Sequence, residues 1–259
     1  MRSDLWQRDQ LILALNLYWK IPYNKISGSS NEEIKKLAKI IGKTPAALAF
    51  MLMNFTALDI ERQDDGKKGK RPPGELATKL WFEYLNNWEK LADDSFEILQ
   101  KINTKAVTEI LNRNDEYENN EGFEKYRTVK SRINQRDFRL RILAAYNTKC
   151  CITNIDIPSL LVASHIIPWS KNVQERLNPR NGLCLNAVHD RAFDNGLITI
   201  TPDFKIKLSE DIFSKKKDVT IQEYFLKYDN TKITLPDRFT PSIEFLEYHN
   251  NIIFEKWLK

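Results

Sequence analysis

The sequence predicts an α+β chain, in which a helical N-terminal domain precedes a mixed domain of short strands and helices. Three observations support this. Apolar residues recur at helical spacing through most of residues 1–103. The sign of the local charge reverses at about residue 122, and short strand-like apolar runs follow Leu140. We therefore predict a helical domain at 1–103, a linker at 104–122 and a second domain at 123–259.

The composition excludes several classes of protein. A hydrophobic content of 42% with 11% aromatic residues can fill a core, which rules out a wholly disordered chain. The longest apolar run, Ala46 to Met53, is far shorter than the roughly 20 residues of a membrane helix. The three cysteines, two of them adjacent, cannot form a disulfide framework. The start also lacks the apolar stretch of a secretory signal, so we expect a soluble, cytoplasmic protein with no membrane partner.

Four helical stretches are predicted in the first domain. The first ends before Pro22, and Asn31 is expected to cap the second. Thr44 and Pro45 suit the N-cap and the first position of the third. A single longer helix is expected from Glu75 to about Ile102.

The second and third of these helices could form a helix-turn-helix, with residues 42–45 as the turn. The stretch from Thr44 to Phe55 contains no Arg or Lys, and only Thr44 and Asn54 could read a base edge. A helix this apolar is as well suited to the core as to recognition. DNA targeting is the role we expect for this domain, through this helix or through other surfaces.

Two basic segments are candidates for contact with nucleic-acid phosphates. One is the loop from Gly66 to Gly74, for which a solvated surface is the alternative. The other runs from Phe123 to Arg141 and contains seven Lys and Arg residues against two acidic residues. The preceding residues 104–122 have the opposite balance, with two basic and five acidic residues. Such contacts would make binding salt-dependent. The predicted contact residues are Lys67, Lys68, Lys70, Arg71, Lys130, Arg132, Arg136, Arg139 and Arg180.

The second domain combines strand-like and helical segments with a pair of histidines. Strands are expected in Leu160–Ile167 and from Gly182 to Leu185, a short helix at Asn186–Asp194, and a hairpin that turns at Pro202. His165 then lies on the first strand, Asn181 before the second and His189 on the helix. Phosphodiester hydrolysis needs a base that titrates near neutrality, a divalent metal that stabilises the leaving 3′ oxygen, and a group that orients the base.

These segments resemble the HNH (ββα-metal) endonucleases, and more narrowly the subgroup found in restriction and modification-dependent restriction enzymes. The resemblance covers about residues 130 to 255. The segments that carry it are Ser164–Trp169, Asn178–Leu183, His189 and Phe193–Gly196, with Gln135–Arg139, Tyr146–Thr153 and Phe245–His249 also fitting the subgroup. It implies a ββα-metal fold and metal-dependent cleavage of double-stranded DNA in restriction or anti-phage defence. Modified DNA is a candidate target.

The resemblance also implies roles for individual residues. His165 would be the general base, and Asn181 would orient that histidine or its loop. His189 would bind the metal, with Ser164 and Asp194 as further ligands. Many HNH sites have a stronger ligand, Asp or His, where this chain has Ser164, and Asp194 could instead cap its helix or bind the following turn. We expect Mg²⁺, with Mn²⁺ as an alternative, and a homodimer where both strands are cut.

Other interpretations remain for parts of this sequence. The cysteines lack the spacing of a structural zinc site, so we expect buried free thiols and no structural zinc. Trp169 and His249 are expected to pack or hydrogen-bond rather than to take part in chemistry. Ser164 in place of a stronger ligand favours a DNA-binding regulator with a non-catalytic HNH scaffold. An RNase or a toxin-type nuclease is a third alternative.

Overall fold

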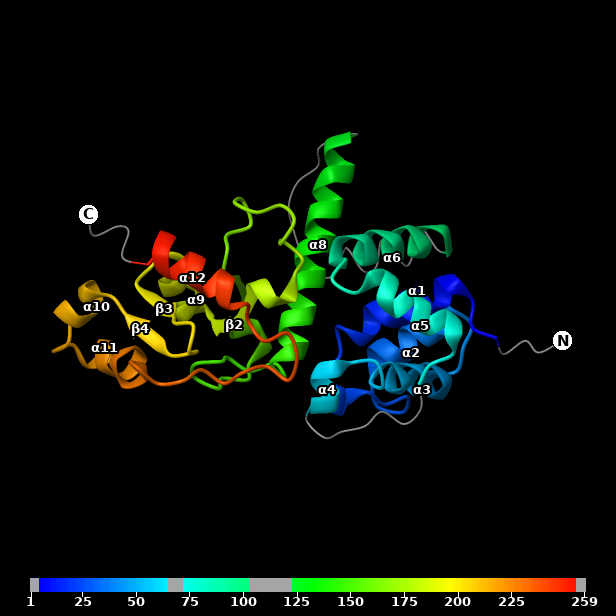
Figure 1. Cartoon of the computed structure of the whole chain (residues 1–259), viewed down its shortest axis with the longest axis horizontal. Helices are drawn as coiled ribbons and strands as arrows, with labels where there is room; N and C mark the ends of the chain where they lie inside the picture. The colour runs from blue at the N-terminus through cyan, green and yellow to red at the C-terminus, as the bar shows by residue number, and fades with distance from the viewer. Residues whose placement is uncertain (1–4, 65–71, 103–122, 255–259) are drawn as a thin grey trace. The chain divides into compact units, whose positions relative to one another are not determined.

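A computed structural model describes residues 5–64, 72–102 and 123–254 of the chain (Figure 1). The chain divides into two compact units, of which the first is Met1–Arg141 and the second is Ile142–Lys259. The predicted linker at 104–122, and with it the predicted domain boundary, lies outside the described residues and stays a prediction. Four predicted phosphate contacts of the basic loop, Lys67, Lys68, Lys70 and Arg71, also lie outside them.

The regular structure described in the first unit is helical, which confirms the predicted helical N-terminal region. Its elements are α1 (Arg8–Tyr18), η1 (Tyr23–Lys25), α2 (Glu32–Ile40), α3 (Pro45–Phe55), α4 (Ile60–Asp64), α5 (Glu75–Tyr84), α6 (Trp88–Ile102) and most of α8 (Phe123–Ala145). Helix α8, which was not predicted from the sequence, continues past Arg141 into the second unit.

Two of the predicted helix starts are confirmed. The side chain of Asn31 accepts hydrogen bonds from the first turn of α2, and the hydroxyl of Thr44 accepts one from the amide of Ala47 at 3.1 Å. The single helix predicted from Glu75 to Ile102 is wrong, because α5 ends at Tyr84 and α6 begins at Trp88. Asn86 between them has a φ of 62°, a left-handed conformation that asparagine tolerates better than most residues. The break allows α5 and α6 to contact each other.

Helix α1 lies at the centre of the first unit and contacts α2, α3, α5 and α6. Its C-terminal end joins an aromatic cluster in which neighbouring ring centroids lie 4.8 to 6.0 Å apart. The cluster consists of Tyr18, Trp19, Phe55, Trp81 and Trp88. Leu48, Leu52 and Phe55 of α3 are also fully buried. Helix α3 therefore packs one face into the core, as its apolar sequence indicates.

The C-terminal part of α8 is attached to α1 and to the segment that follows α1 by buried charged groups. The ammonium of Lys20 donates to the carboxylate of Asp137 at 2.7 Å, and Arg141 donates to the side chain of Asn16 at 3.3 Å. Burial lowers the pKa of Lys20 and of Arg141, while the charge of Asp137 acts in the opposite direction. Because isolated buried charges are costly, these pairs fix the position of α8 on the first unit.

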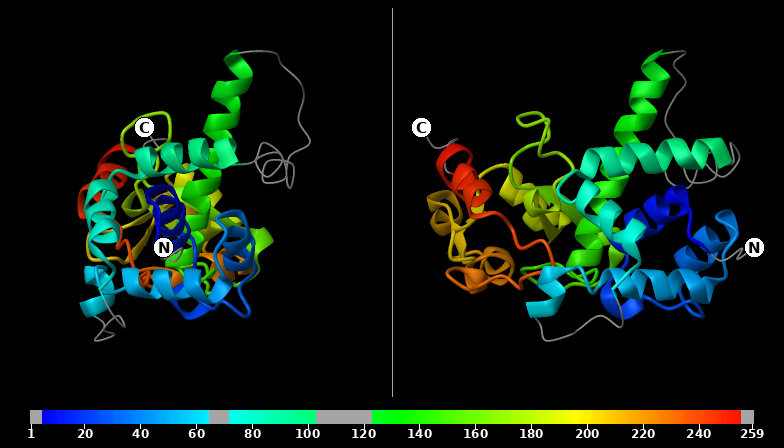
Figure 2. Two further views of the ribbon diagram at one scale, coloured as in Figure 1. Left: turned by 90° about the vertical axis from the view of Figure 1, so that its right-hand side faces the viewer. Right: turned by 45° about the vertical axis from the view of Figure 1, so that its right-hand side comes forward.

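The second unit contains two antiparallel pairs of strands with helices around them. Its elements are η2 (Pro158–Leu160), β1 (Leu161–His165), η3 (Pro179–Asn181), β2 (Gly182–Asn186), α9 (Ala187–Asp194), β3 (Ile198–Ile200), β4 (Ile206–Leu208), α10 (Glu210–Ser214), α11 (Val219–Tyr224), η4 (Leu226–Tyr228) and α12 (Ile243–Ile252). β1 pairs with β2, and β3 pairs with β4 in the predicted hairpin. Helix α9 contacts both pairs, and α12, red in Figure 2, packs against β3.

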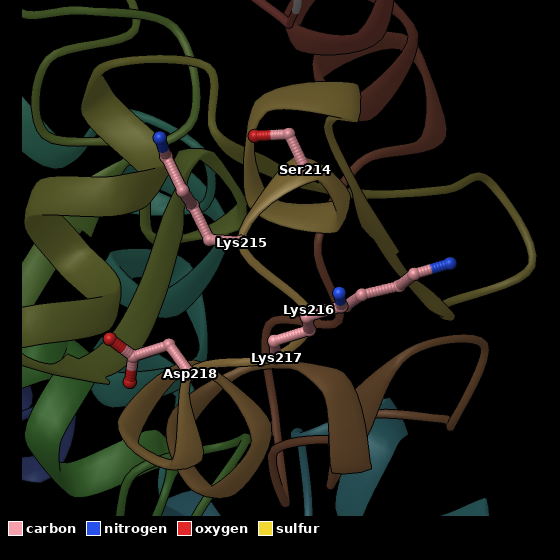
Figure 3. Close-up of a pocket in the computed structure, with 5 residues that line it drawn as sticks. All are labelled: Ser214, Lys215, Lys216, Lys217 and Asp218. Atoms are coloured by element: carbon pink, nitrogen blue, oxygen red, sulfur yellow. The ribbon is translucent and has the colours of Figure 1, made fainter.

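The turn between α10 and α11 carries three consecutive lysines. Lys215, Lys216 and Lys217, together with Ser214 and Asp218, line an open cavity of about 410 Å³ (Figure 3). Asp218 also caps α11, because its carboxylate accepts hydrogen bonds from the first turn of that helix. None of the residues predicted for catalysis or metal binding lines this cavity.

No helix in the described parts of the chain has the length and apolar composition needed to span a bilayer.

Candidate active site

The strand–loop–strand–helix segment of the second unit places the predicted site residues in one region. β1 runs antiparallel to β2, with Ser164 opposite Leu183 and His165 opposite Gly182. Asn186 ends β2 and begins α9, since its side-chain oxygen accepts hydrogen bonds from the amides of the first turn. Helix α9 then packs on both strands. The order of elements expected from the sequence is therefore observed.

His165 is held by a main-chain carbonyl of the loop that follows β1. Its Nε2 lies 2.9 Å from the carbonyl oxygen of Arg176. A carbonyl oxygen only accepts, so Nε2 carries the proton and the neutral ring carries its lone pair on Nδ1. Burial lowers the pKa of His165, the Arg176 carbonyl raises it, and the charge of Arg176 lowers it further. The result is a neutral imidazole in a defined tautomer, which is the state that a general base requires.

Asn181 holds the loop that positions His165. Its Oδ1 accepts a hydrogen bond from the amide of Ile167 at 2.7 Å, and its Nδ2 donates to the carbonyls of Ile167 and Glu175, each at 3.2 Å. Its own carbonyl accepts from the amide of Ile166 at 3.0 Å. With only 1% of its surface exposed, Asn181 acts on the loop from inside the protein.

His189 is buried, with both ring nitrogens in hydrogen bonds. Nε2 donates to the carbonyl of Tyr224 at 2.7 Å, and Nδ1 accepts from the side-chain amide of Asn186 at 2.7 Å. The rings of Phe225 and Tyr228 lie edge-on to it. Burial lowers the pKa of His189, so the ring is held neutral. His189 could bind a metal ion, as the sequence predicts, only if one of these hydrogen bonds were broken.

The hydroxyl of Ser164 on β1 lies near the carboxylate of Asp190 on α9, and Asp194 lies one turn further along the same helix. Ser164 is 2% exposed, and its hydroxyl makes no hydrogen bond to the described residues. Burial raises the pKa of Asp190, while the nearby Ser164 hydroxyl and Arg191 lower it. Burial also raises the pKa of Asp194 to about 6, with a further contribution from the negative charge of Asp190. Asp190 therefore lies near Ser164 on one side and near the exposed Asp194 on the other.

Asp190 is a candidate ligand that was not predicted from the sequence, where the metal prediction fell on the neighbouring His189. The spacing of the acidic residues could have indicated this site, because Asp190 and Asp194 are four residues apart and therefore share one face of α9. The described residues contain no group of three or more His, Cys, Asp or Glu side chains arranged to hold a metal ion. Ser164, Asp190 and Asp194 nevertheless carry oxygen donors of the hard type that Mg²⁺ and Mn²⁺ prefer.

The predicted phosphate contacts are divided between the two units. Arg132 and Arg136 are exposed and Arg139 is half-buried, all on the part of α8 that belongs to the first unit. Arg180 lies next to Asn181 in the second unit and donates to the carbonyl of Thr240 at 3.1 Å. The side chain of Lys130 lies outside the described residues. These residues stay predictions as nucleic-acid contacts.

The remaining side chains singled out in the sequence pack in the interior of the second unit. His249 stacks on Phe193 with ring centroids 3.7 Å apart, and it hydrogen-bonds to Thr199 and to the Phe193 carbonyl. The three cysteines are buried free thiols, and Sγ of Cys150 accepts a hydrogen bond from the amide of Asn186 at 3.3 Å. The expected packing of His249 and burial of the thiols are both confirmed.

Residues 150–201 match the family model of the HNH endonucleases. The matched segment spans β1, β2, α9 and β3, and so includes Ser164, His165, Asn181 and the acidic pair on α9. The match supports an HNH endonuclease domain at residues 150–201, in line with the family predicted for this part of the chain. No curated protein matches the chain.

Proposed function

We propose that the chain is a metal-dependent DNA endonuclease of restriction or anti-phage defence, acting in the cytoplasm. The observation that supports this best is the setting of His165. Its imidazole is oriented by the Arg176 carbonyl and follows Ser164, a buried hydroxyl near the carboxylate of Asp190. The HNH match spans these groups. The strand–strand–helix order is also that of a ββα-metal fold, which we propose for this domain.

In this proposal, His165 is the general base. Its Nδ1 takes a proton from a water molecule whose oxygen attacks the phosphorus of a DNA phosphodiester. The bond from phosphorus to the 3′ oxygen breaks, the 3′ oxygen leaves with the bonding electrons and takes a proton from solvent, and the products are a 5′-phosphate and a 3′-hydroxyl. Asn181 contributes by holding Ile167 and Glu175, so that the loop keeps the Arg176 carbonyl against Nε2.

Asp190, Asp194 and Ser164 are the residues that we propose as metal ligands. Their donors are all oxygens, and the buried Ser164 hydroxyl makes no hydrogen bond to the described residues. A bound Mg²⁺ or Mn²⁺ would stabilise the negative charge that develops on the phosphate and the leaving oxygen. His189 then has a supporting role, because its hydrogen bonds to Asn186 and Tyr224 fix the first turn of α9, from which Asp190 projects.

The first unit is proposed to select the DNA target. The exposed Arg132 and Arg136 on α8 are its proposed phosphate contacts, together with the half-buried Arg139. Modified cytosine is the candidate signal. One active site cuts one strand, so we propose that two copies of the chain act together on double-stranded DNA.

The test is cleavage of supercoiled plasmid, unmodified or carrying modified cytosines, with Mg²⁺ or with EDTA. We expect metal-dependent cutting by the wild type and a loss of at least about 100-fold in His165→Ala, since general-base catalysis contributes roughly this much. Asp190→Asn and Asp194→Asn should also lose cutting, and should bind Mn²⁺ more weakly in calorimetry. Asp156→Asn is the matched control, because Asp156 is exposed in the loop before β1.

The outcomes separate the proposal from its alternatives. Cutting that is retained in EDTA or in His165→Ala would contradict it. DNA binding without cleavage by a folded wild type would favour a non-catalytic scaffold, the alternative suggested by the weak ligand Ser164. Cleavage of RNA in preference to every plasmid would point to a ribonuclease instead.

A further inference from the structure

The side chain of Arg176 joins the two ends of the loop between β1 and η3. Its Nε donates to the carbonyl of Trp169 at 2.7 Å, and its guanidinium carbon lies 5.1 Å from the centre of the Trp169 ring. Charged and aromatic groups attract at this distance, so the contact adds to the hydrogen bond. One side chain thereby fixes both the main chain and the ring of a residue seven positions earlier.

The main chain of Arg176 acts on His165 in the same place. Its carbonyl accepts the proton of Nε2 at 2.9 Å, and the ring of Trp169 lies edge-on to the imidazole with centroids 5.4 Å apart. His165, Trp169 and Arg176 therefore form a closed triangle in which each contacts the other two. The imidazole is held on one side by the Arg176 carbonyl and on another by the Trp169 ring.

Asn181 does not duplicate these contacts. The side chain of Asn181 makes hydrogen bonds to the main chain of Ile167, near the start of the loop, and of Glu175, near its end. Neither of these contacts reaches Trp169. The Glu175 carbonyl is adjacent to Arg176, so Asn181 restrains the chain leading into that residue. The contact that fixes the Trp169 end, and with it the second side of the imidazole, comes from the Arg176 guanidinium.

We propose that Arg176 is a positioning residue for His165, whose guanidinium locks Trp169 so that its own main-chain carbonyl holds the imidazole protonated at Nε2. The consequence for catalysis rests on the proposed function, because it matters only if Nδ1 is the general base. The tautomer and orientation of the ring do not depend on that assumption. They can be measured on the metal-free protein whether or not it cleaves DNA.

The first arm of the test is NMR of the imidazole nitrogens at pH 8 in EDTA. The chain has three histidines, so His165→Gln identifies the signal of interest. We expect the wild type to show a protonated Nε2 and a lone pair on Nδ1. Arg176→Gln should move the His165 signals toward the average of the two tautomers, and Arg176→Lys should also do so, because an ammonium lacks the planar guanidinium geometry.

The controls separate a local effect from loss of fold. Lys171→Gln removes one positive charge from an exposed position of the same loop and should leave the His165 signals unchanged. The signals of His189 and His249 should also stay in place in every variant. A second variant, Trp169→Leu, removes the ring but keeps the carbonyl, and should disturb His165 less than Arg176→Gln.

The second arm is cleavage kinetics. If the proposed function holds, Arg176→Gln should lower kcat by about 100-fold with little change in KM, as expected for a misplaced catalytic group. Unchanged His165 signals in Arg176→Gln would overturn the inference. A higher KM with shallower salt dependence and an unchanged tautomer would mean that Arg176 binds DNA phosphate instead. An inactive wild type with the expected NMR shifts would refute the proposed function and leave the positioning role intact.

Discussion

The three histidines of the chain occupy three different environments. His165 is half-buried, with Nε2 on the Arg176 carbonyl. His189 uses both nitrogens to connect Asn186 with Tyr224, and His249 uses both to connect Thr199 with Phe193. Two of the rings thus serve to connect segments of the second unit, although the sequence singles out His165 and His189 equally.

Asn181→Ala should destabilise the second unit. The amide of Ile167 and the carbonyl of Glu175 would lose a buried partner, which typically costs about 1–3 kcal/mol. Asn181→Asp should be at least as destabilising in spite of its similar shape, because a carboxylate oxygen would face the two carbonyls that Nδ2 now contacts. Urea unfolding of both variants measures the change in the free energy of unfolding.

The matched control for this prediction is Asn251→Ala, an exposed position on α12. Its free energy of unfolding should stay within about 0.5 kcal/mol of the wild type. If Asn181→Asp proved as stable as the wild type, the assigned orientation of the Asn181 amide would be wrong.

At the scale of elements, the start of α9 connects several parts of the second unit. Asn186 caps the helix through its side-chain oxygen, and its side-chain nitrogen donates to His189. Its main-chain amide donates to Cys150. The residue thus combines a common local role with contacts to the side chains of Cys150, Thr153 and His189, and so connects the start of α9 to the surrounding structure.

Asn186→Ala should therefore cost more than the loss of an ordinary cap. An N-cap is typically worth about 1 kcal/mol, and here the buried His189 would also lose its partner at Nδ1. Asp218→Ala removes the exposed N-cap of α11 in the same unit and provides the comparison. In urea unfolding, we expect the free energy to fall by about 1 kcal/mol for Asp218→Ala and by more for Asn186→Ala; equal losses would contradict the extra role.

At the scale of the whole molecule, the buried histidines should make the second unit sensitive to acid. Burial lowers the pKa of His249 to about 4, from an ordinary value of 6.5. The unfolded chain then binds a proton that the folded chain does not, so the stabilisation is complete above pH 6.5 and declines as the pH falls toward 4. By pH 5 the loss from His249 alone should reach about 2 kcal/mol.

The measurement compares urea unfolding of the wild type and His249→Gln from pH 7.5 to pH 5. His249→Gln lacks the titrating group, so the stability difference between the two proteins should shrink as the pH falls. Glu244→Gln, an exposed change on the same helix, should give a difference that does not vary with pH in this way. A constant difference for His249→Gln would show that its ring is not held neutral by burial.

The local signals of the chain were strong enough to predict many elements. Side chains at Asn31, Thr44 and Asn186 cap their helices because the groups involved are within three residues of one another. The predicted hairpin is confirmed by the pairing of β3 with β4. Two predictions failed where the local pattern was ambiguous. The helix predicted from Glu75 to Ile102 is broken between Tyr84 and Trp88, because the helical spacing of apolar residues continues through the turn there. The highly charged α8 was not predicted as a helix.

The sequence by itself determined the helical N-terminal region, the order of strand, loop, strand and helix, and the HNH family of residues 150–201. Residue type and spacing are sufficient for these. Only the tertiary structure placed Asp190 near Ser164, enclosed both nitrogens of His189, and brought Arg176 and Trp169 against His165. The physical reason is that burial, hydrogen-bond partners and charge around a side chain come from segments distant in sequence, which spacing alone cannot specify.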